Sequence, residues 1–157
     1  MKLTREFFAR PSPIVAPELI GRRLVRNFKD KKYSVLITET GAYEGGKRQG
    51  LCYGPGEIYV AIFRGGYEML CIGTEAIGIP SVVTIRKAYP LEGVDADLTG
   101  SGRLSRALHI DKKFECAGIG CTDLYIEGDP AGTSRVLVIT PDMEKMAENC
   151  LGYYRLF

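Results

Sequence analysis

The sequence has few of the features that identify a metal site, a disulfide framework or a membrane span. It contains one histidine, His109, and five cysteines, none of them in a C-x-x-C pair, so we expect no metal site. The odd cysteine count, together with first ten residues too polar for a secretory signal, predicts free thiols in a cytoplasmic protein. No apolar run is long enough to cross a bilayer, and we expect no membrane contact.

Charge of one sign is also scarce. The formal net charge is only +2, and nucleic-acid binding depends on clustered rather than total charge. The clusters are small: Arg22-Arg23, Lys29 to Lys32, Lys47-Arg48, Arg86-Lys87, Arg103 with Arg106, and Lys112-Lys113. Taken one at a time, such pairs are typical of a solvated surface and identify no partner.

Short strands and turns dominate the sequence pattern. Residues 33–43 alternate with a period of two, and residues 57–63 and 67–72, joined by Gly65-Gly66, predict a hairpin. Further strands are expected over residues 24–28, 81–88, 124–126, 135–140 and 153–157, and helices over residues 14–20, 104–110 and 141–150. We therefore predict one α+β domain over residues 1–157, with a curved, mostly antiparallel β-sheet and a few flanking helices.

Glu39 occupies an unusual position in the long strand. The period of two places it on the same face as Val35, Ile37, Gly41 and Tyr43. A carboxylate among apolar side chains either has a function there or reaches solvent at the end of the strand. The pattern alone leaves both interpretations open.

Five groups of residues follow one another in a recognisable order. They are Phe7-Phe8 and Arg10 with Val15-Ala16 and Leu19 to Gly21; Glu39-Thr40, Ala42-Tyr43 and Gly45; Gly54 to Gly56 with Tyr59-Val60 and Gly65; Arg86 with Pro90 and Gly93; and Gly100 to Ile110. In this order they resemble the motifs F-F-x-R, E-T-E-A-Y-x-G, P-G-x-x-Y-V-x-x-x-Y-G, R-A-x-x-P-x-x-G and G-P-G-K-L-x-x-A-L-G-I. These motifs belong to the alkyladenine (3-methyladenine, or methylpurine) DNA glycosylase family, and the resemblance covers residues 3–140.

The resemblance implies a base excision repair protein that acts as a monomer at the nucleoid. Members bind double-stranded DNA with alkylated or deaminated purines, flip the damaged nucleotide out and hydrolyse its N-glycosidic bond. They use no metal or redox cofactor. Carried over to this chain, the resemblance makes Tyr43 a base-stacking residue and Arg86 a pocket residue. It assigns phosphate contacts to Lys47, Arg48, Gly102, Arg103 and Arg106.

The sequence departs from the family at the excision pocket. Gly41 stands where the general-base glutamate belongs, and the histidine-bearing D-x-A-S-H stretch expected after Gly45 is missing. Ala61 replaces the second stacking aromatic, Arg64 the wedge tyrosine, and Cys71 the asparagine that discriminates against guanine. The motifs around the pocket are retained, so we expect the scaffold to be kept while the pocket has changed.

Three functions are compatible with these changes. The expected function is a divergent glycosylase in which Glu39, about 7 Å from Gly41 along a strand, or Glu44 supplies the carboxylate and Arg64 the wedge. The alternative is a non-catalytic DNA or lesion binder on the same scaffold. A third hypothesis is that a pocket enlarged at Gly41, Ala61 and Cys71 binds a small purine or another ligand instead of nucleic acid.

Overall fold

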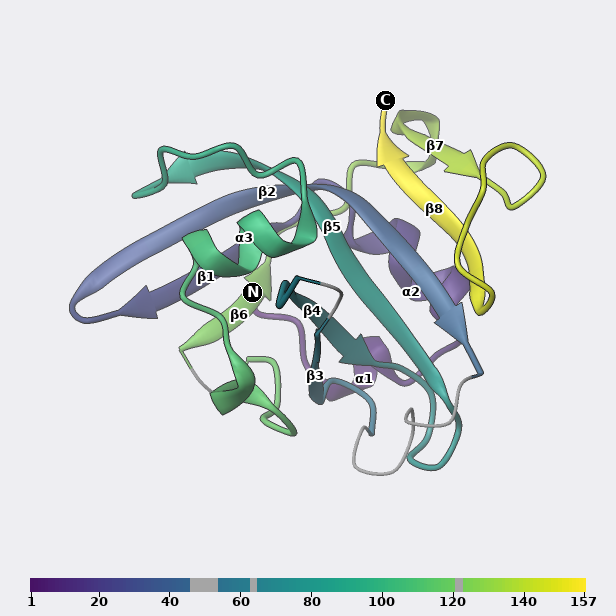
Figure 1. Cartoon of the computed structure of the whole chain (residues 1–157), viewed down its shortest axis with the longest axis horizontal. Helices are drawn as coiled ribbons and strands as arrows, with labels where there is room; N and C mark the ends of the chain where they lie inside the picture. The colour runs from purple at the N-terminus through teal and green to yellow at the C-terminus, as the bar shows by residue number, and fades with distance from the viewer. Residues whose placement is uncertain (46–53, 63–64, 121–122) are drawn as a thin grey trace.

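A curled antiparallel sheet organises the chain. The computed structural model describes residues 1–45, 54–62, 65–120 and 123–157, and Figure 1 shows a half-barrel-like sheet with helices on both sides. The strands are β1 (Arg23–Phe28), β2 (Lys31–Glu44), β3 (Ile58–Ile62), β4 (Glu68–Gly73), β5 (Ser81–Glu92), β6 (Leu124–Glu127), β7 (Val136–Ile139) and β8 (Cys150–Leu156). The helices are α1 (Arg5–Phe8), α2 (Ser12–Leu19) and α3 (Ser101–Ala107), with 3-10 turns η1 (Lys112–Phe114) and η2 (Thr133–Arg135). The predicted α+β class is confirmed.

Strand β2 is the central element of the sheet. The strand order is β3-β4-β5-β2-β1-β6, and β8 joins β2 on the side away from β5 while pairing with β7. The first part of β2 therefore lies between β5 and β1, and its last part lies between β5 and β8. This arrangement brings the C-terminal strand against the segment that carries Glu39, Gly41 and Tyr43.

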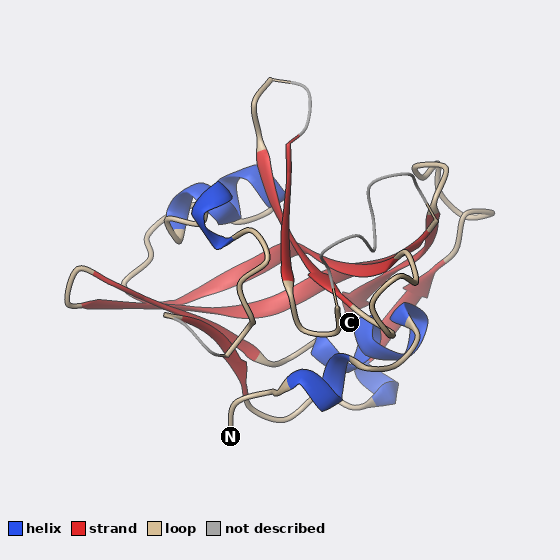
Figure 2. Ribbon diagram, turned by 90° about the horizontal axis from the view of Figure 1, so that it is seen from below, coloured by secondary structure: helices blue, strands red, loops and turns tan. Residues whose placement is uncertain are grey.

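The predicted hairpin is present and projects from the sheet. Figure 2 shows β3 and β4 rising on the side opposite α1 and α2, next to α3. Ile58, Val60, Leu70 and Ile72 pack into the main core. Because side chains alternate along a strand, the odd-numbered hairpin residues face the other way, over the end of β2.

Two register shifts in β2, on either side of Glu39, correct the predicted faces of that strand. Val35 and Ile37 pack in the main core together with Ala42, so the core-facing positions change from odd to even numbers within the strand. Bulges of this kind re-aim side chains. Glu39 and Tyr43 consequently lie on the opposite face from Ile37, and not on a shared apolar face as the simple period of two predicts.

One predicted helix is wrong. Residues 141–149 form turns and irregular chain, and the last strand begins at Cys150. A helix needs an apolar stripe to bury, and here the side chains of residues 141–145 are exposed, including Met143 at 65%. The expected helix over residues 104–110 is present but begins at Ser101 and ends at Ala107.

Candidate functional site

Several predicted pocket residues meet at the base of the hairpin. Met69, Cys71 and Val82 form a small buried cluster, against which Tyr43 and Ala61 pack. Tyr43 also packs against Ile139, Cys150 and Tyr153 on the β7–β8 side. Tyr43 thus lies between the hairpin and the C-terminal strands, partly buried and partly exposed.

Burial affects the ionisable groups of this cluster. Loss of water around Tyr43 raises the pKa of its phenol, and the hydrogen bond to Tyr153 raises it further. Burial also raises the pKa of the Cys71 thiol to about 12. Both groups are therefore neutral at physiological pH, and neither supplies a nucleophile or a base.

Gly41 is enclosed by side chains and has no room for a larger one. A Cβ atom at this position would lie 2.9 Å from Thr84 Oγ1, 2.9 Å from Tyr43 Cε1 and 3.3 Å from Tyr153 Cδ1. Gly41 pairs with Thr84 of β5 on one side and with Tyr153 of β8 on the other. The place where the resemblance puts the general base is thus occupied by two tyrosine rings and a threonine hydroxyl.

Glu39, the substitute base that the sequence suggests, is the centre of an ion cluster. Its side chain is 1% exposed. Arg86 Nε donates to Oε2 at 3.0 Å, Arg155 Nε donates to Oε1, and Lys87 Nζ lies 3.8 Å from Oε1. Burial by itself raises the pKa of this carboxyl, but the two guanidinium hydrogen bonds outweigh it and lower the pKa overall. Glu39 is therefore a weakened base with both oxygens engaged.

Arg86 connects the ion cluster with the tyrosines. Its guanidinium carbon lies 3.6 Å from the centre of the Tyr153 ring, within cation–π range. Burial opposes the charge on Arg86, yet the hydrogen bond to Glu39 and the nearby phenol groups raise the pKa overall. Arg86 therefore remains a cation held between Glu39 and Tyr153.

Sequence reasoning missed two members of this site, Tyr153 and Arg155. The only local signal was their spacing, since alternate residues of a strand share a face. Nothing in the spacing shows that β8 pairs with β2, because Arg155 and Glu39 are 116 positions apart. The site therefore depends on a long-range strand pairing.

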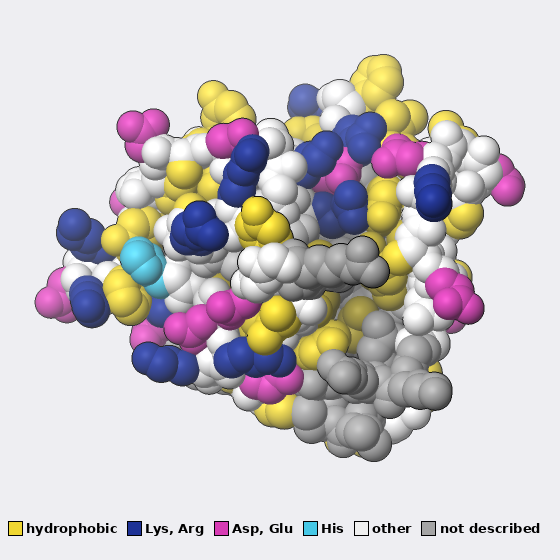
Figure 3. Space-filling model, in the orientation of Figure 1, with side chains coloured by type: hydrophobic (Ala, Val, Ile, Leu, Met, Phe, Trp, Pro, Cys, Tyr) yellow, Lys and Arg dark blue, Asp and Glu magenta, His cyan; other side chains and the backbone are white. Residues whose placement is uncertain are grey.

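The other predicted site residues are more dispersed. Arg103 is exposed and paired with Asp97 at 2.6 Å, Arg106 is exposed on α3, and Glu44 is exposed at the end of β2. The Tyr67 ring covers Gly102, where a Cβ would lie 2.6 Å from Tyr67 Cδ1. Lys47, Arg48 and Arg64 lie outside the described residues. In the view of Figure 3, several cationic side chains gather around an acidic one at the upper centre, and the others are spread over the face with acidic side chains between them.

Residues 1–45, 54–62, 65–120 and 123–157 contain neither a cluster of metal-ligating side chains nor a membrane-spanning helix. No set of three or more His, Cys, Asp or Glu side chains there is arranged to hold a metal ion. No helix of the described chain has the length and apolar character needed to cross a membrane.

Comparison with known proteins decides the family. The family model described as Methylpurine-DNA glycosylase (MPG) matches residues 6–141. This chain belongs to the methylpurine-DNA glycosylase family. The resemblance noted in the sequence is thereby confirmed.

Relatives described as "Putative 3-methyladenine DNA glycosylase" match this family member over most of its length. The Anaeromyxobacter sp. relative is 33% identical, covering 87% of this chain and 78% of its own. The Legionella pneumophila relative is 32% identical, covering 88% and 82%. The Methanocella arvoryzae relative is 29% identical, covering 99% and 91%. The similarity extends over the whole fold and is not confined to one motif.

Proposed function

We propose that this methylpurine-DNA glycosylase family member recognises damaged or abasic-like positions in double-stranded DNA without releasing the base. The observation that carries the proposal is the state of Glu39. A general base must lie within hydrogen-bond reach of the water that it activates. Glu39 is buried, and both of its oxygens accept hydrogen bonds from arginines.

Recognition is supported by the groups that lie together beneath the hairpin. Tyr43 retains partial exposure beside the small side chains of Ala61 and Cys71, and an aromatic ring of this kind can stack on a flipped base. Arg86 places a cation next to Tyr153 on the same side. In this proposal Arg64, between β3 and β4, is the wedge, while Lys47, Arg48, Gly102, Arg103 and Arg106 contact phosphates.

Base excision is the second candidate function, favoured by the relatives that are described as "Putative 3-methyladenine DNA glycosylase". It would require Glu39 to exchange its arginine hydrogen bonds for a water, or Glu44 to reach the flipped sugar from the exposed end of β2. Alkylated purines that carry a positive charge leave as neutral bases. Their excision therefore requires the least catalytic assistance from a site with fewer catalytic groups.

Binding and excision can be tested on the same oligonucleotides. Flipping a nucleotide costs a few kcal/mol, and least where base pairing is already lost. We therefore expect a duplex with a tetrahydrofuran abasic analogue to bind about tenfold tighter than its undamaged counterpart, a difference of about 1.4 kcal/mol. Fluorescence anisotropy at fixed salt measures both affinities. Equal affinities would end the proposal.

Two variants test whether the preference for the abasic analogue depends on Tyr43. Tyr43→Ala should abolish the preference for the abasic analogue, whereas Tyr89→Ala, at a 63% exposed tyrosine, should retain it. Purines released from methylated DNA are then quantified by mass spectrometry for the wild type and for Glu39→Gln. Release by the wild type above a protein-free blank would replace the proposal with the excision function, and loss of that release in Glu39→Gln would assign it to Glu39 instead of Glu44.

A further inference from the structure

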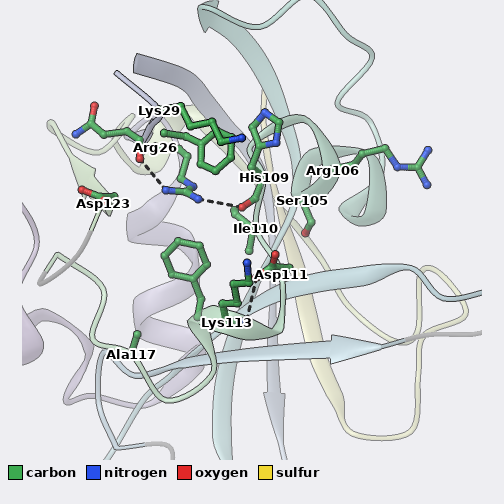
Figure 4. Close-up of a pocket in the computed structure, with 13 residues that line it drawn as sticks. Arg26, Lys29, Ser105, Arg106, His109, Ile110, Asp111, Lys113, Ala117 and Asp123 are labelled. Atoms are coloured by element: carbon green, nitrogen blue, oxygen red, sulfur yellow. Dashed lines mark hydrogen bonds between the residues drawn. The ribbon is translucent and has the colours of Figure 1, made fainter. Parts of the chain in front are cut away.

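A second charged region lies away from Glu39, between β1, α3 and η1. It is an open cleft of about 480 Å³, shown in Figure 4. Arg26 and Phe28 reach it from β1, Lys29 from the turn after β1, and Lys113 from η1. Arg106 also lines it, although Figure 4 shows its side chain pointing away from the others.

Arg26 is the most informative residue of the cleft, because it is a buried cation without a counter-charge. Its side chain donates to the backbone carbonyl oxygens of Leu108 at 3.0 Å, Asn27 at 2.7 Å and His109 at 3.2 Å. These bonds use three of the five N–H donors of a guanidinium. Within the described ranges no carboxylate lies at ion-pair distance from Arg26, although the residue is only 7% exposed.

Aromatic rings hold this guanidinium in place. Its central carbon lies 4.8 Å from the Phe28 ring centre and 4.7 Å from that of Phe114. His109 stacks on Phe28, with ring centres 4.3 Å apart and planes 16° from parallel. Burial lowers the pKa of Arg26, partly offset by the more distant Asp123 and Asp111. Its charge is therefore fixed in position but poorly compensated, which is costly inside a protein.

Ser105 provides a second, independent observation. It is 2% exposed and lines the same cleft, yet its hydroxyl oxygen has no hydrogen-bond partner among the residues that the structure describes. Buried polar groups are normally paired, and an unpaired one calls for an explanation. A ligand that accepts hydrogen bonds in the cleft would satisfy both Ser105 and Arg26.

We propose that this cleft binds a phosphate oxyanion, from a nucleic-acid backbone or a free nucleotide. Phosphate offers several acceptor oxygens to donors that converge from different elements. Four cationic side chains line the cleft against two acidic ones, and one of these, Asp111, already accepts the Lys113 backbone N–H at 2.9 Å. The inference does not depend on lesion recognition at Tyr43.

An adjoining cleft of about 430 Å³ favours the nucleic-acid source. It shares Asn27, Phe28, Lys29 and Asp123 with the first cleft and adds Asp30, Lys31 and Lys32, so that three lysines line it against two aspartates. A series of cations along one edge matches the succession of charges along a phosphodiester backbone. The two clefts together would contact the duplex at a distance from the flipped nucleotide.

The first experiment measures the salt dependence of binding to undamaged duplex, which keeps it separate from lesion recognition. Each phosphate contact contributes about 0.9 to the slope of log K against log salt. Lys29→Gln/Lys113→Gln removes two exposed cations of the cleft and should lower that slope by about 1.8. The control is Arg135→Gln/Lys145→Gln, which removes the same charge at exposed positions outside both clefts. Its slope should stay close to that of the wild type.

The second experiment distinguishes the two sources of phosphate. Inorganic phosphate and a deoxynucleoside monophosphate are titrated at constant ionic strength into isotope-labelled protein. We expect saturable shifts of the Ser105 and His109 amide signals in the wild type and in the control, but not in Lys29→Gln/Lys113→Gln. Shifts without a change of salt slope would assign the site to free nucleotides, and a slope change with or without shifts would assign it to DNA. A cleft variant that matches the control in both experiments would overturn the proposal.

Discussion

Glu39 and Arg26 are both charged residues buried by the same sheet, but their surroundings differ in kind. Glu39 is neutralised by two arginines and a lysine, next to a glycine position filled by tyrosine rings. Arg26 has carbonyl oxygens and aromatic rings around it and faces an open cleft. A buried charge that is already paired contributes to folding, whereas an incompletely paired one that opens to solvent remains available to a ligand.

In this family member, buried charge is paired near Gly41 and Glu39 but incompletely paired at Arg26. The residues aligned with the excision pocket meet in space, yet at Gly41 and Glu39 the region is organised for packing and ion pairing. The incompletely paired charge lies instead in the cleft between β1, α3 and η1, of which only the α3 side belongs to a family motif. Substitutions near Glu39 and Gly41 should therefore lower the free energy of unfolding. Substitution of Ser105 in the cleft should leave it nearly unchanged and weaken anion binding instead.

The largest expected effect is at Glu39. Glu39→Gln leaves Arg86 and Arg155 without their counter-charge and should lower the free energy of unfolding at pH 7 by about 3 kcal/mol. This is the lower end of the range for breaking a buried ion pair, because the two arginines are partly solvated. Urea denaturation measures the difference, with the exposed Glu44→Gln as control, expected to change stability by less than about 0.5 kcal/mol. Equal stability of the two variants would show that the Glu39 cluster is not structural.

The stability difference between the wild type and Glu39→Gln should also depend on pH. The folded-state pKa of Glu39 lies below its ordinary value of 4.5, so the stabilisation is fully present above pH 4.5. It is lost as the pH falls through the folded-state value. The stability difference between wild type and Glu39→Gln should therefore shrink on acidification, and a difference that grows instead would contradict the assigned direction of the shift.

The next largest effect concerns the filled position at Gly41. Gly41→Ala places a Cβ 2.9 Å from Thr84 Oγ1 and from Tyr43 Cε1 and should cost about 2 kcal/mol through overpacking. In a Thr84→Ala background, which removes one of the two close atoms, the cost should be smaller, so a double-mutant cycle by urea denaturation reveals the coupling. An unchanged cost in both backgrounds would mean that Gly41 is not enclosed as described.

A smaller effect is expected from the phenol of Tyr43. Tyr43→Phe removes the hydrogen bond with Tyr153 and should lower stability by about 1 kcal/mol. Because the ring remains, the preference for an abasic analogue should persist. Thermal unfolding and anisotropy measure the two properties. A variant that loses the DNA preference at unchanged stability would move the role of Tyr43 from its ring to its hydroxyl.

The smallest effect is predicted in the open cleft. Ser105→Ala deletes a buried hydroxyl that has no partner in the described part of the protein, so stability without ligand should stay within about 0.5 kcal/mol of the wild type or rise slightly. The Ser105 hydroxyl matters only when an anion is bound. The variant should therefore bind inorganic phosphate more weakly than the wild type, and a large loss of unliganded stability would assign the hydroxyl a structural role.

Local residue patterns were sufficient for much of the fold. The alternation over residues 57–63 and 67–72 with Gly65-Gly66 between them located the projecting hairpin, because strand period and turn chemistry are short-range properties. The same reasoning failed over residues 141–149, where composition suggested a helix but no surface exists to bury it. It also failed at Glu39, because a bulge depends on the partner strand as much as on the bulged one.

The order of the motifs and the strand periodicity were enough to predict the family and a strand-rich architecture, and the resemblance placed Gly41 at the position of the family's general base. The folded chain was needed to show that β8 brings Tyr153 over Gly41 and Arg155 onto Glu39, and that Arg26 is buried beside an open cleft. The physical reason is that packing and charge compensation arise between segments far apart in the chain, whose pairing no local period encodes. The type of a residue is visible in the sequence. Its pKa and its accessibility to a ligand depend on the groups that the folded chain places against it.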